Sequence, residues 1–454
     1  MKRITFFICA LSFCSALSWG QTWKLSATMT ATLNAGILTV ETTKDAEEMS
    51  DYRKSNSTPW SKSKSNIHSI SIKEGVSKIG ARAFADLPNL NVVTIPNSVT
   101  MIGEESFKSC INLTTITIPN SVSSIGNNAF NKCTSMASIV LSESLHTIEW
   151  GMFSGCTSLT SVTVPNSVTT IGNNAFYSCT SLASIILSNS LHTIEWKAFS
   201  DCTSLTSVTI PNSVTTIEPL AFIGCTNLIS ISLPSSIETI YGGTFSGCTN
   251  LTSIVIPNSV TTIGRKGEFV VSPFEADKRN ALEKKYDFRT RVALSSVGAF
   301  ENCSSLTSVT LSNKATMIGL STFKNCVSLT HIDIPNSVES IYNQAFMGCH
   351  KLKSVTIPNS VTHLWISVFS DCKSLTSITI PSSVIYMGGL LFSDCTALKD
   401  ITVSWPEPLT GRGRLIGVFG RLKTTEITLH VPAGTEELYR ADRLWKDFKI
   451  VASD

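Results

Sequence analysis

Apolar and polar positions repeat along most of this chain with a fixed period of 23 residues. In one unit, residues 159–181, Val162 and Val164 alternate with Ser161 and Thr163. An alternation of period two predicts a strand with one buried and one exposed face. We therefore expect each unit to begin with a short strand that presents Ser and Thr to solvent.

The rest of the same unit predicts a closed coil with a second short strand. Pro165 ends the first strand because it lacks a backbone donor, and Val168 and Ile171 supply a second inward stretch. Gly172 permits a corner, and Phe176 enters the centre from a short helical turn. A coil this small cannot bury these residues alone, so we expect neighbouring coils to stack on it.

Phe and Cys carry the period most clearly. Phe recurs every 23 residues from Phe84 to Phe392, with one step of 55, and twelve Cys keep the same spacing from Cys110 to Cys395. A period of about 20–29 residues is typical of leucine-rich repeat solenoids. The sequence thus predicts a solenoid of thirteen Phe-centred coils. Its fourteen parallel strands, at ~4.8 Å each, would give a rod of roughly 65 Å.

The repeated unit Ile-Pro-Asn-Ser-Val…Ile-Gly…Ala-Phe…Cys resembles the repeats of the BspA-like family of surface leucine-rich repeat proteins. The N-terminal part, with Trp23 and Pro59-Trp60, is similar to the first cap of that family, and residues 429–448 resemble its closing module. The resemblance implies a secreted or cell-surface binding protein, often an adhesin for host or bacterial proteins. Fold by itself does not fix function.

The N-terminus has the order of a secretory signal peptide. Lys2 and Arg3 precede an apolar run from Ile4 to Leu17 and then small residues ending at Gly20. The run is too short to cross a bilayer, which needs ~20 apolar residues. We expect an exported protein, extracellular or at the cell surface, without a transmembrane span.

Charge changes the picture in two ways. The 36 basic and 33 acidic side chains leave a net charge of +3, too small to favour nucleic acid as a partner. Residues 265–296 hold 13 of the charges in 32 positions, which marks them as an insert. An N-cap Ser followed by Pro predicts a helix over 273–288. The insert is either an added contact surface or a tolerated loop, since long insertions cost little.

These patterns divide the chain into six segments. They are a signal peptide (1–20), an N-terminal cap hairpin (21–66), leucine-rich repeats (67–264), the charged insert (265–296), further repeats (297–399) and a C-terminal cap (400–454).

The twelve repeat Cys allow two interpretations. Disulfides between adjacent coils fit the spacing, since ~5 Å between Cα atoms is within the allowed range. Leu87 occupies the same position in the first coil, however, which indicates an apolar slot and favours buried free thiols. Zinc is disfavoured because a 23-residue spacing lacks paired ligands.

The exposed strand positions supply the candidate ligand-binding residues. Hydroxyl ladders that include Thr163 are interrupted by Val140, Ile186 and Val255. Ser and Thr are ordinary soluble strand residues, but that explains the three apolar residues less well. An open face of this kind suits a macromolecular ligand.

His331 and Asp333 replace Ser and Thr on the same outward positions, and Ser308 and Ser354 should flank His331. The grouping is superficially that of a Ser-His-Asp hydrolase. Residues i and i+2 of a strand lie ~6.5 Å apart, and no nucleophile turn or oxyanion site accompanies them. A polar binding patch is the better interpretation.

We therefore expect a non-enzymatic solenoid, with no cofactor and no metal, that binds a protein ligand such as a host extracellular or bacterial surface protein. The alternative is a carbohydrate-binding or envelope-structural module, against which the few exposed aromatics argue. A hydrolase at His331 and Asp333 is the remote alternative.

Overall fold

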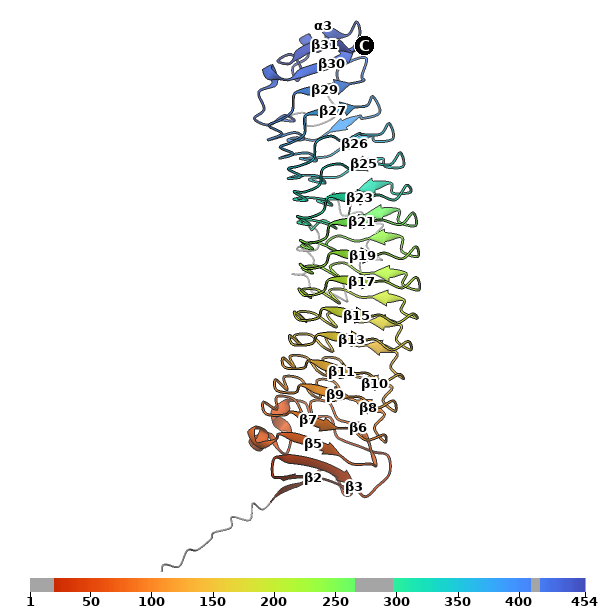
Figure 1. The fold of residues 1–454 in the computed structure, drawn as a ribbon, viewed down its shortest axis with the longest axis vertical. Coiled ribbons are helices and arrows are strands. Elements are labelled where there is room, and N and C mark those ends of the chain that lie inside the picture. Colours follow the sequence, from red (N-terminus) through yellow and green to blue (C-terminus); the bar gives the residue numbers. More distant parts are fainter. Residues whose placement is uncertain (1–19, 266–296, 410–416, 454) are drawn as a thin grey trace, which may run out of the picture.

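The computed structural model describes residues 20–265, 297–409 and 417–453. In Figure 1 the coils stack along one long axis into a rod with a cap at each end. Each coil contributes up to two short strands. The second strands pair in parallel in sheets of several coils, and most first strands pair in parallel two by two. The predicted fold class, a leucine-rich repeat solenoid with a parallel strand stack, is confirmed.

The first strand of each coil lies on one side of the rod. These strands are β5 (Ser69–Ile72), β7 (Val92–Thr94), β9 (Thr115–Thr117), β11 (Ser138–Val140), β13 (Ser161–Thr163), β15 (Ser184–Ile186), β17 (Ser207–Thr209), β19 (Ser230–Ser232), β21 (Ser253–Val255), β23 (Ser308–Thr310), β27 (Ser377–Ile380) and β29 (Asp400–Val403). Between β23 and β27, two coils contribute isolated bridges at Asp333 and Thr356.

The second strand of each coil forms the lateral sheets. These strands are β6 (Val76–Ile79), β8 (Met101–Ile102), β10 (Ser124–Ile125), β12 (Thr147–Ile148), β14 (Thr170–Ile171), β16 (Thr193–Ile194), β18 (Thr216–Ile217), β20 (Thr239–Ile240), β22 (Thr262–Ile263), β24 (Met317–Ile318), β25 (Ser340–Ile341), β26 (His363–Leu364) and β28 (Tyr386–Met387).

Pairing partners lie one period apart throughout the stack. Val162 pairs with Ile185, and the register crosses the insert unchanged, because Ser253 pairs with Ser308 and Thr262 with Met317. The insert therefore leaves the coils on either side in direct contact.

The third side of each coil differs from the sequence prediction. The described coils contain no helix there, whereas we expected a short helical turn. Asn174 and Ser178 take left-handed conformations, with φ of 53° and 56°, on either side of Phe176. The amide of Phe176 donates to Ala198 of the next coil at 2.8 Å rather than within its own turn. A helix is excluded because left-handed residues and intercoil bonds interrupt its hydrogen-bond series.

The core is a continuous column of aromatic rings. All thirteen predicted Phe residues are fully buried, and consecutive ring centroids lie 5.2–5.9 Å apart. Trp60 extends the column at the N-terminal end and Phe419 at the C-terminal end. Every coil thus buries its ring only because its neighbours are present, as expected for a solenoid.

The N-terminal cap closes one end of the rod with an antiparallel hairpin. β1 (Gln21–Lys24) pairs with β2 (Met29–Asn34), which pairs with β3 (Ile37–Thr42) through a turn at Ala35 and Gly36, both with positive φ. β3 then pairs in parallel with β5. The remaining cap elements are β4 (Glu47–Glu48) and the 3-10 turns η1 (Ser55–Ser57) and η2 (Ser61–Asn66).

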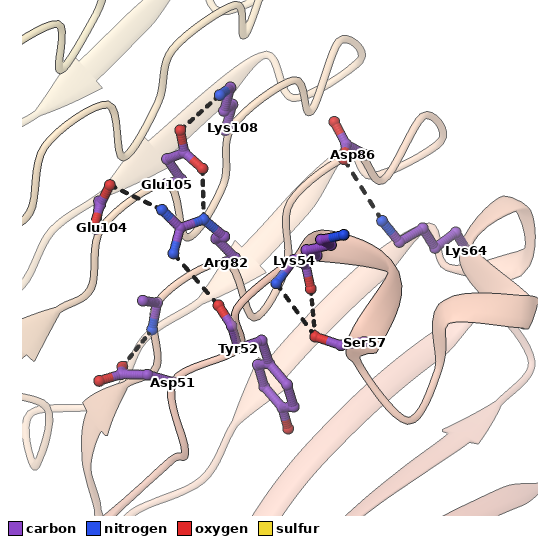
Figure 2. A network of polar contacts seen from close by, with 11 residues as sticks. Asp51, Tyr52, Lys54, Ser57, Lys64, Arg82, Asp86, Glu104, Glu105 and Lys108 are labelled. Carbon is purple, nitrogen blue, oxygen red and sulfur yellow. Dashed lines mark hydrogen bonds and ion pairs between the residues drawn. The ribbon is translucent and has the colours of Figure 1, made fainter.

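A polar network joins this cap to the first coils (Figure 2). The Arg82 guanidinium contacts Glu104 at 2.9 Å and Glu105 at 2.7 Å, and donates to the carbonyl of Tyr52 in the cap. Asp51 accepts from the amide of Ala81 at 2.7 Å. Arg82 therefore links the N-terminal cap to the first two coils of the rod.

The C-terminal cap extends the strand stack. β29 pairs in parallel with β30 (Thr428–Pro432), and β30 with β31 (Lys449–Ser453). The cap also contains the 3-10 turn η4 (Thr424–Glu426) and the short helix α3 (Glu436–Ala441). Buried Tyr439 donates its hydroxyl to the carbonyl of Trp405 at 2.8 Å, which fixes α3 over the last coils.

Two predictions fall outside the described residues. The signal peptide, apart from Gly20, and the helix over 273–288 remain predictions of the sequence alone.

Candidate binding surface

The outward side chains of the first strands form one continuous surface, which we call the open strand face. It consists of the first and third residues of the odd-numbered strands from β7 to β23, together with the outward residues of β27. In the two coils between β23 and β27, the equivalent residues are His331, Asp333, Ser354 and Thr356. Strand alternation dictates this arrangement, because the central residue of each strand is buried and its two neighbours are exposed. Parallel pairing without register shift within successive strand pairs, together with the constant stacking of the coils, aligns equivalent residues into columns along the rod.

The three predicted apolar residues are strongly exposed on this face. Val140, Ile186 and Val255 are 58%, 64% and 66% exposed. Each lies beside a threonine of the adjacent coil; Ile186, for example, pairs with Thr163. A branched aliphatic side chain exposed to water does not stabilise the core. Covering it with a partner would remove its apolar surface from water, which favours binding.

The polar part of the face is largely uncommitted. Ser161, Thr163 and Thr209 are exposed, and within the described part of the chain their hydroxyls form no side-chain hydrogen bond. Ser138 is an exception, since its hydroxyl donates to that of Thr115 at 3.3 Å. The open strand face therefore offers donors and acceptors as well as apolar groups.

The sequence-predicted residues share the face but not one pocket. Val140, Thr163 and Ile186 lie on three successive coils. Val255 is three coils beyond Ile186, and Asp333 two coils beyond Val255. Seven coil steps separate Val140 from Asp333, or about 34 Å at the strand spacing. The arrangement suits an extended contact with a macromolecule.

His331 and Asp333 are brought together more closely than the backbone spacing suggested. His331 Nε2 lies 2.8 Å from Asp333 Oδ1, and both side chains are exposed. Among the described residues, no side-chain hydrogen bond joins His331 to Ser308 or Ser354. Within the described chain the pair has no hydrogen-bonded serine beside it, and it presents a polar, hydrogen-bonding patch.

Sequence reasoning missed a second pair of the same type. His430 of β30 lies 3.1 Å from Asp400 of β29, on the strands that continue the stack into the C-terminal cap. It also missed the exposed apolar residues Val92, on β7, and Ile229, directly before β19, which are 55% and 51% exposed. Aligning the units by their period would have identified Val92, Ile229 and Asp400, whereas His430 follows a step of 28 residues from β29 to β30 and falls outside that period.

The repeat Cys carry no chemistry at this surface. All twelve are free and buried, and each thiol donates to the carbonyl of a Phe in the preceding coil, as Cys202 does to Phe176 at 3.2 Å. Burial raises the pKa of most of these thiols, to about 12 for Cys110 and Cys156. Neutral thiols without solvent access are poor nucleophiles and poor metal ligands.

Two further findings bear on function. In residues 20–265, 297–409 and 417–453, no three His, Cys, Asp or Glu side chains are placed to hold a metal ion. None of the helices in these same ranges has the length and apolarity that a membrane span requires.

Comparison with known proteins matches the geometry. A family model described as the BspA type leucine rich repeat region matches residues 61–183, 153–267 and 295–406. The chain is similar to a solved leucine-rich repeat protein from Bacteroides ovatus, with 22% identity over 95% of this chain and 100% of that one, and a TM-score of 0.55. This likeness concerns the fold.

Two other solved structures are also similar. A leucine rich cell surface protein from Faecalibacterium prausnitzii shares 28% identity over 79% of this chain and 94% of that one, with a TM-score of 0.46. A leucine-rich repeat protein from Eubacterium ventriosum shares 22% identity over 84% and 96%, with a TM-score of 0.48. No curated protein sequence matches the chain.

Proposed function

Because the chain belongs to the BspA-type leucine-rich repeat family, we propose that it is an exported surface protein that binds a second protein through the open strand face. It acts by binding and not by catalysis. The single observation that carries the proposal is the exposure of Val140, Ile186 and Val255 on a surface that otherwise consists mainly of Ser and Thr. Protein interfaces combine such apolar groups with a surrounding hydrogen-bonding surface.

Export is supported by the sequence of the N-terminus. The basic residues Lys2 and Arg3 and the apolar run that follows have the order of a signal peptide. An exported protein that acts by binding contacts its partners outside the cell.

The two His–Asp pairs give one end of the face a different chemistry. His331–Asp333 lies in the C-terminal third of the open strand face, and His430–Asp400 lies just beyond it on β30 and β29, whereas Val140 and Ile186 lie in its N-terminal half. We therefore expect one partner to make apolar contacts in the N-terminal half of the face and polar contacts toward the C-terminal cap.

The repeats themselves provide the test. Val140→Thr, Ile186→Thr and Val255→Thr restore the residue found at Thr163 and Thr209, so the triple variant should fold. Burying an aliphatic side chain contributes about 1.5–3 kcal/mol. Each of these is roughly 60% exposed and Thr keeps one methyl, so the loss is about 1 kcal/mol per site. Three sites predict a Kd roughly 100-fold weaker.

The assay uses a partner captured by the mature rod from host or bacterial surface extracts and then purified. Met101→Thr is the matched control, because Met101 is 43% exposed on the lateral strand β8, away from the open strand face. Its Kd should equal that of the wild type. Equal affinity of the triple variant and the wild type would refute the open strand face as the binding surface.

A further inference from the structure

Four aromatic side chains from three successive coils meet on the lateral sheet near the C-terminal end. Trp365 stacks on Tyr342 with ring centroids 5.6 Å apart, and His363 lies 5.9 Å from Trp365. Tyr386 lies 5.0 Å from Trp365 and 5.8 Å from His363. We call these four residues the lateral aromatic cluster.

The register of the sheet creates the cluster. His363 pairs with Tyr386 between β26 and β28, and the amide of Trp365 donates to Ile341 of the preceding coil, beside Tyr342. Cluster residues on different coils are 21 to 44 positions apart in the sequence, so only coil stacking brings them together.

The repeat does not need these rings. The position of Trp365 is Gly in most coils, including Gly172, Gly319 and Gly388. In the described part of the chain, the indole Nε1 of Trp365 is buried without a hydrogen-bond partner, which costs stability. Trp365 replaces a Gly and leaves its indole donor unpaired, so packing of the repeat alone explains this side chain poorly.

The surroundings of the cluster are apolar or neutral. Ile366 and Ile385 flank it and are 43% and 52% exposed. The lateral segments of the four coils around the cluster are residues 316–321, 339–344, 362–367 and 385–390. Within them, Glu339 is the one acidic or permanently basic side chain. The patch therefore has little charge with which to select a charged partner.

Polar groups remain free within the cluster. His363 Nδ1 contacts the Thr362 hydroxyl at 2.8 Å, while among the described residues its Nε2 and the Tyr386 hydroxyl have no hydrogen bond. Aromatic faces carry negative charge density, which attracts the polarised C–H groups of a sugar ring. Unpaired donors and acceptors at the rim suit its hydroxyls.

We propose that the lateral aromatic cluster is a binding site for a neutral oligosaccharide, separate from the open strand face. Neutral charge matches the patch, the partly exposed Trp365 and Tyr386 rings offer aromatic surface to the C–H groups of a pyranose, and His363 Nε2 and the Tyr386 hydroxyl match its hydroxyls. Three coils span about 10 Å along the rod, enough for roughly two sugar units in a row.

The test measures retardation of the protein in native gels that contain neutral polysaccharides: cellulose ether, xylan, galactomannan, β-1,3-glucan or amylopectin. A hexasaccharide of the polymer that binds then gives Kd by titration. The wild type should bind at least one polymer. The double variant Trp365→Gly, Tyr386→Thr restores residues found in other coils, and its Kd should rise at least tenfold.

Tyr241→Gly is the matched control. Tyr241 occupies the repeat position of Trp365 but lies outside the cluster and is 40% exposed, so its removal should leave Kd unchanged. If the double variant melts at a lower temperature than the wild type, hydroxyl-radical footprinting of the wild type decides instead. Trp365 and Tyr386 should then be oxidised at least twofold more slowly with saturating hexasaccharide.

Three results of the binding assays would overturn the proposal. They are no retardation by any neutral polymer, unchanged binding by the double variant, and preferential binding of an anionic polymer such as hyaluronan. Capture of a protein at the cluster in place of sugar would assign a different class of ligand and would also overturn it. The triple variant of the open strand face should bind the oligosaccharide normally, so failure of one proposal is distinguishable from failure of the other.

Discussion

The buried thiols predict an unusual sensitivity to alkaline pH. Burial raises the pKa of eleven of the twelve repeat thiols above the ordinary value of 9.0, to about 12 where a value is resolved. The unfolded chain loses these protons near pH 9, whereas the folded chain keeps them. Their contribution to stability is therefore complete below pH 9 and is lost as the pH rises toward 12.

The magnitude follows from proton linkage. At pH 9.5, a thiol with a pKa of 9.0 lowers the free energy of the unfolded state by about 0.8 kcal/mol, so eleven thiols lower it by about 9 kcal/mol. Folded proteins are stable by only about 5–15 kcal/mol. We expect the rod to lose most of its stability between pH 7.5 and 9.5, below the range in which most Lys and Tyr titrate.

The assay is urea denaturation followed by circular dichroism, under reducing conditions, at both pH values. The control replaces every third thiol: Cys133→Ala, Cys202→Ala, Cys303→Ala and Cys372→Ala. With seven shifted thiols left, its free energy of unfolding should fall by about 6 kcal/mol over the same pH interval.

Equal falls in the wild type and the control would refute the linkage reasoning. Disulfides would also refute it, and they appear in the intact mass as a loss of two protons per Cys pair. Alkylation of the folded protein at neutral pH would contradict the burial of the thiols.

Two further predictions concern the stability of the rod. Phe222→Ala removes a fully buried ring from the aromatic column and should lower the free energy of unfolding by about 3–5 kcal/mol; a loss below about 1 kcal/mol in urea denaturation would contradict a continuous core. Arg82→Ala removes the ion pairs and the Tyr52 contact shown in Figure 2, which are partly exposed and contribute about 1 kcal/mol. Amide exchange should accelerate in residues 21–66 and not in residues 297–399, and uniform acceleration would contradict a local role for Arg82.

The period made much of the fold predictable. Alternation at Ser161 to Val164 correctly indicated a half-buried strand, because burial of one strand face is a property of adjacent residues. The Phe spacing likewise predicted the core column, and the 55-residue step showed where extra sequence enters. These inferences depend on local pattern, which a sequence displays directly.

The conformation of the third side was not predictable in the same way. Asn174 and Ser178 take left-handed conformations, and residues as different as Lys197 and Leu220 take the first of these positions in other coils. No residue type marks the first position. At the second, however, Gly, Asp and Asn predominate, as at Gly155 and Asp201, and this signal for a left-handed conformation was missed. The bonds from each coil to the next, which decide the conformation, connect residues 22 positions apart.

The candidate sites were also predictable only as far as local sequence pattern determines them. Exposure of Val140, Ile186 and Val255 followed from alternation, but the 2.8 Å contact of His331 and Asp333 depended on side-chain orientation, which backbone spacing leaves open. The lateral aromatic cluster escaped notice because 8 Trp and 7 Tyr in 454 residues suggest scarcity. Only alignment by coil places Tyr342, Trp365 and Tyr386 together.

Footprinting of the rod in complex with its captured protein partner tests the central claim most directly. Hydrogen–deuterium exchange cannot report on side chains, so hydroxyl-radical oxidation, which labels exposed apolar side chains, is the measurement of choice. The account predicts protection of Val140, Ile186 and Val255, with Met101 on the lateral sheet oxidised at its free rate. Protection of Met101 with the open strand face fully oxidised would contradict the account.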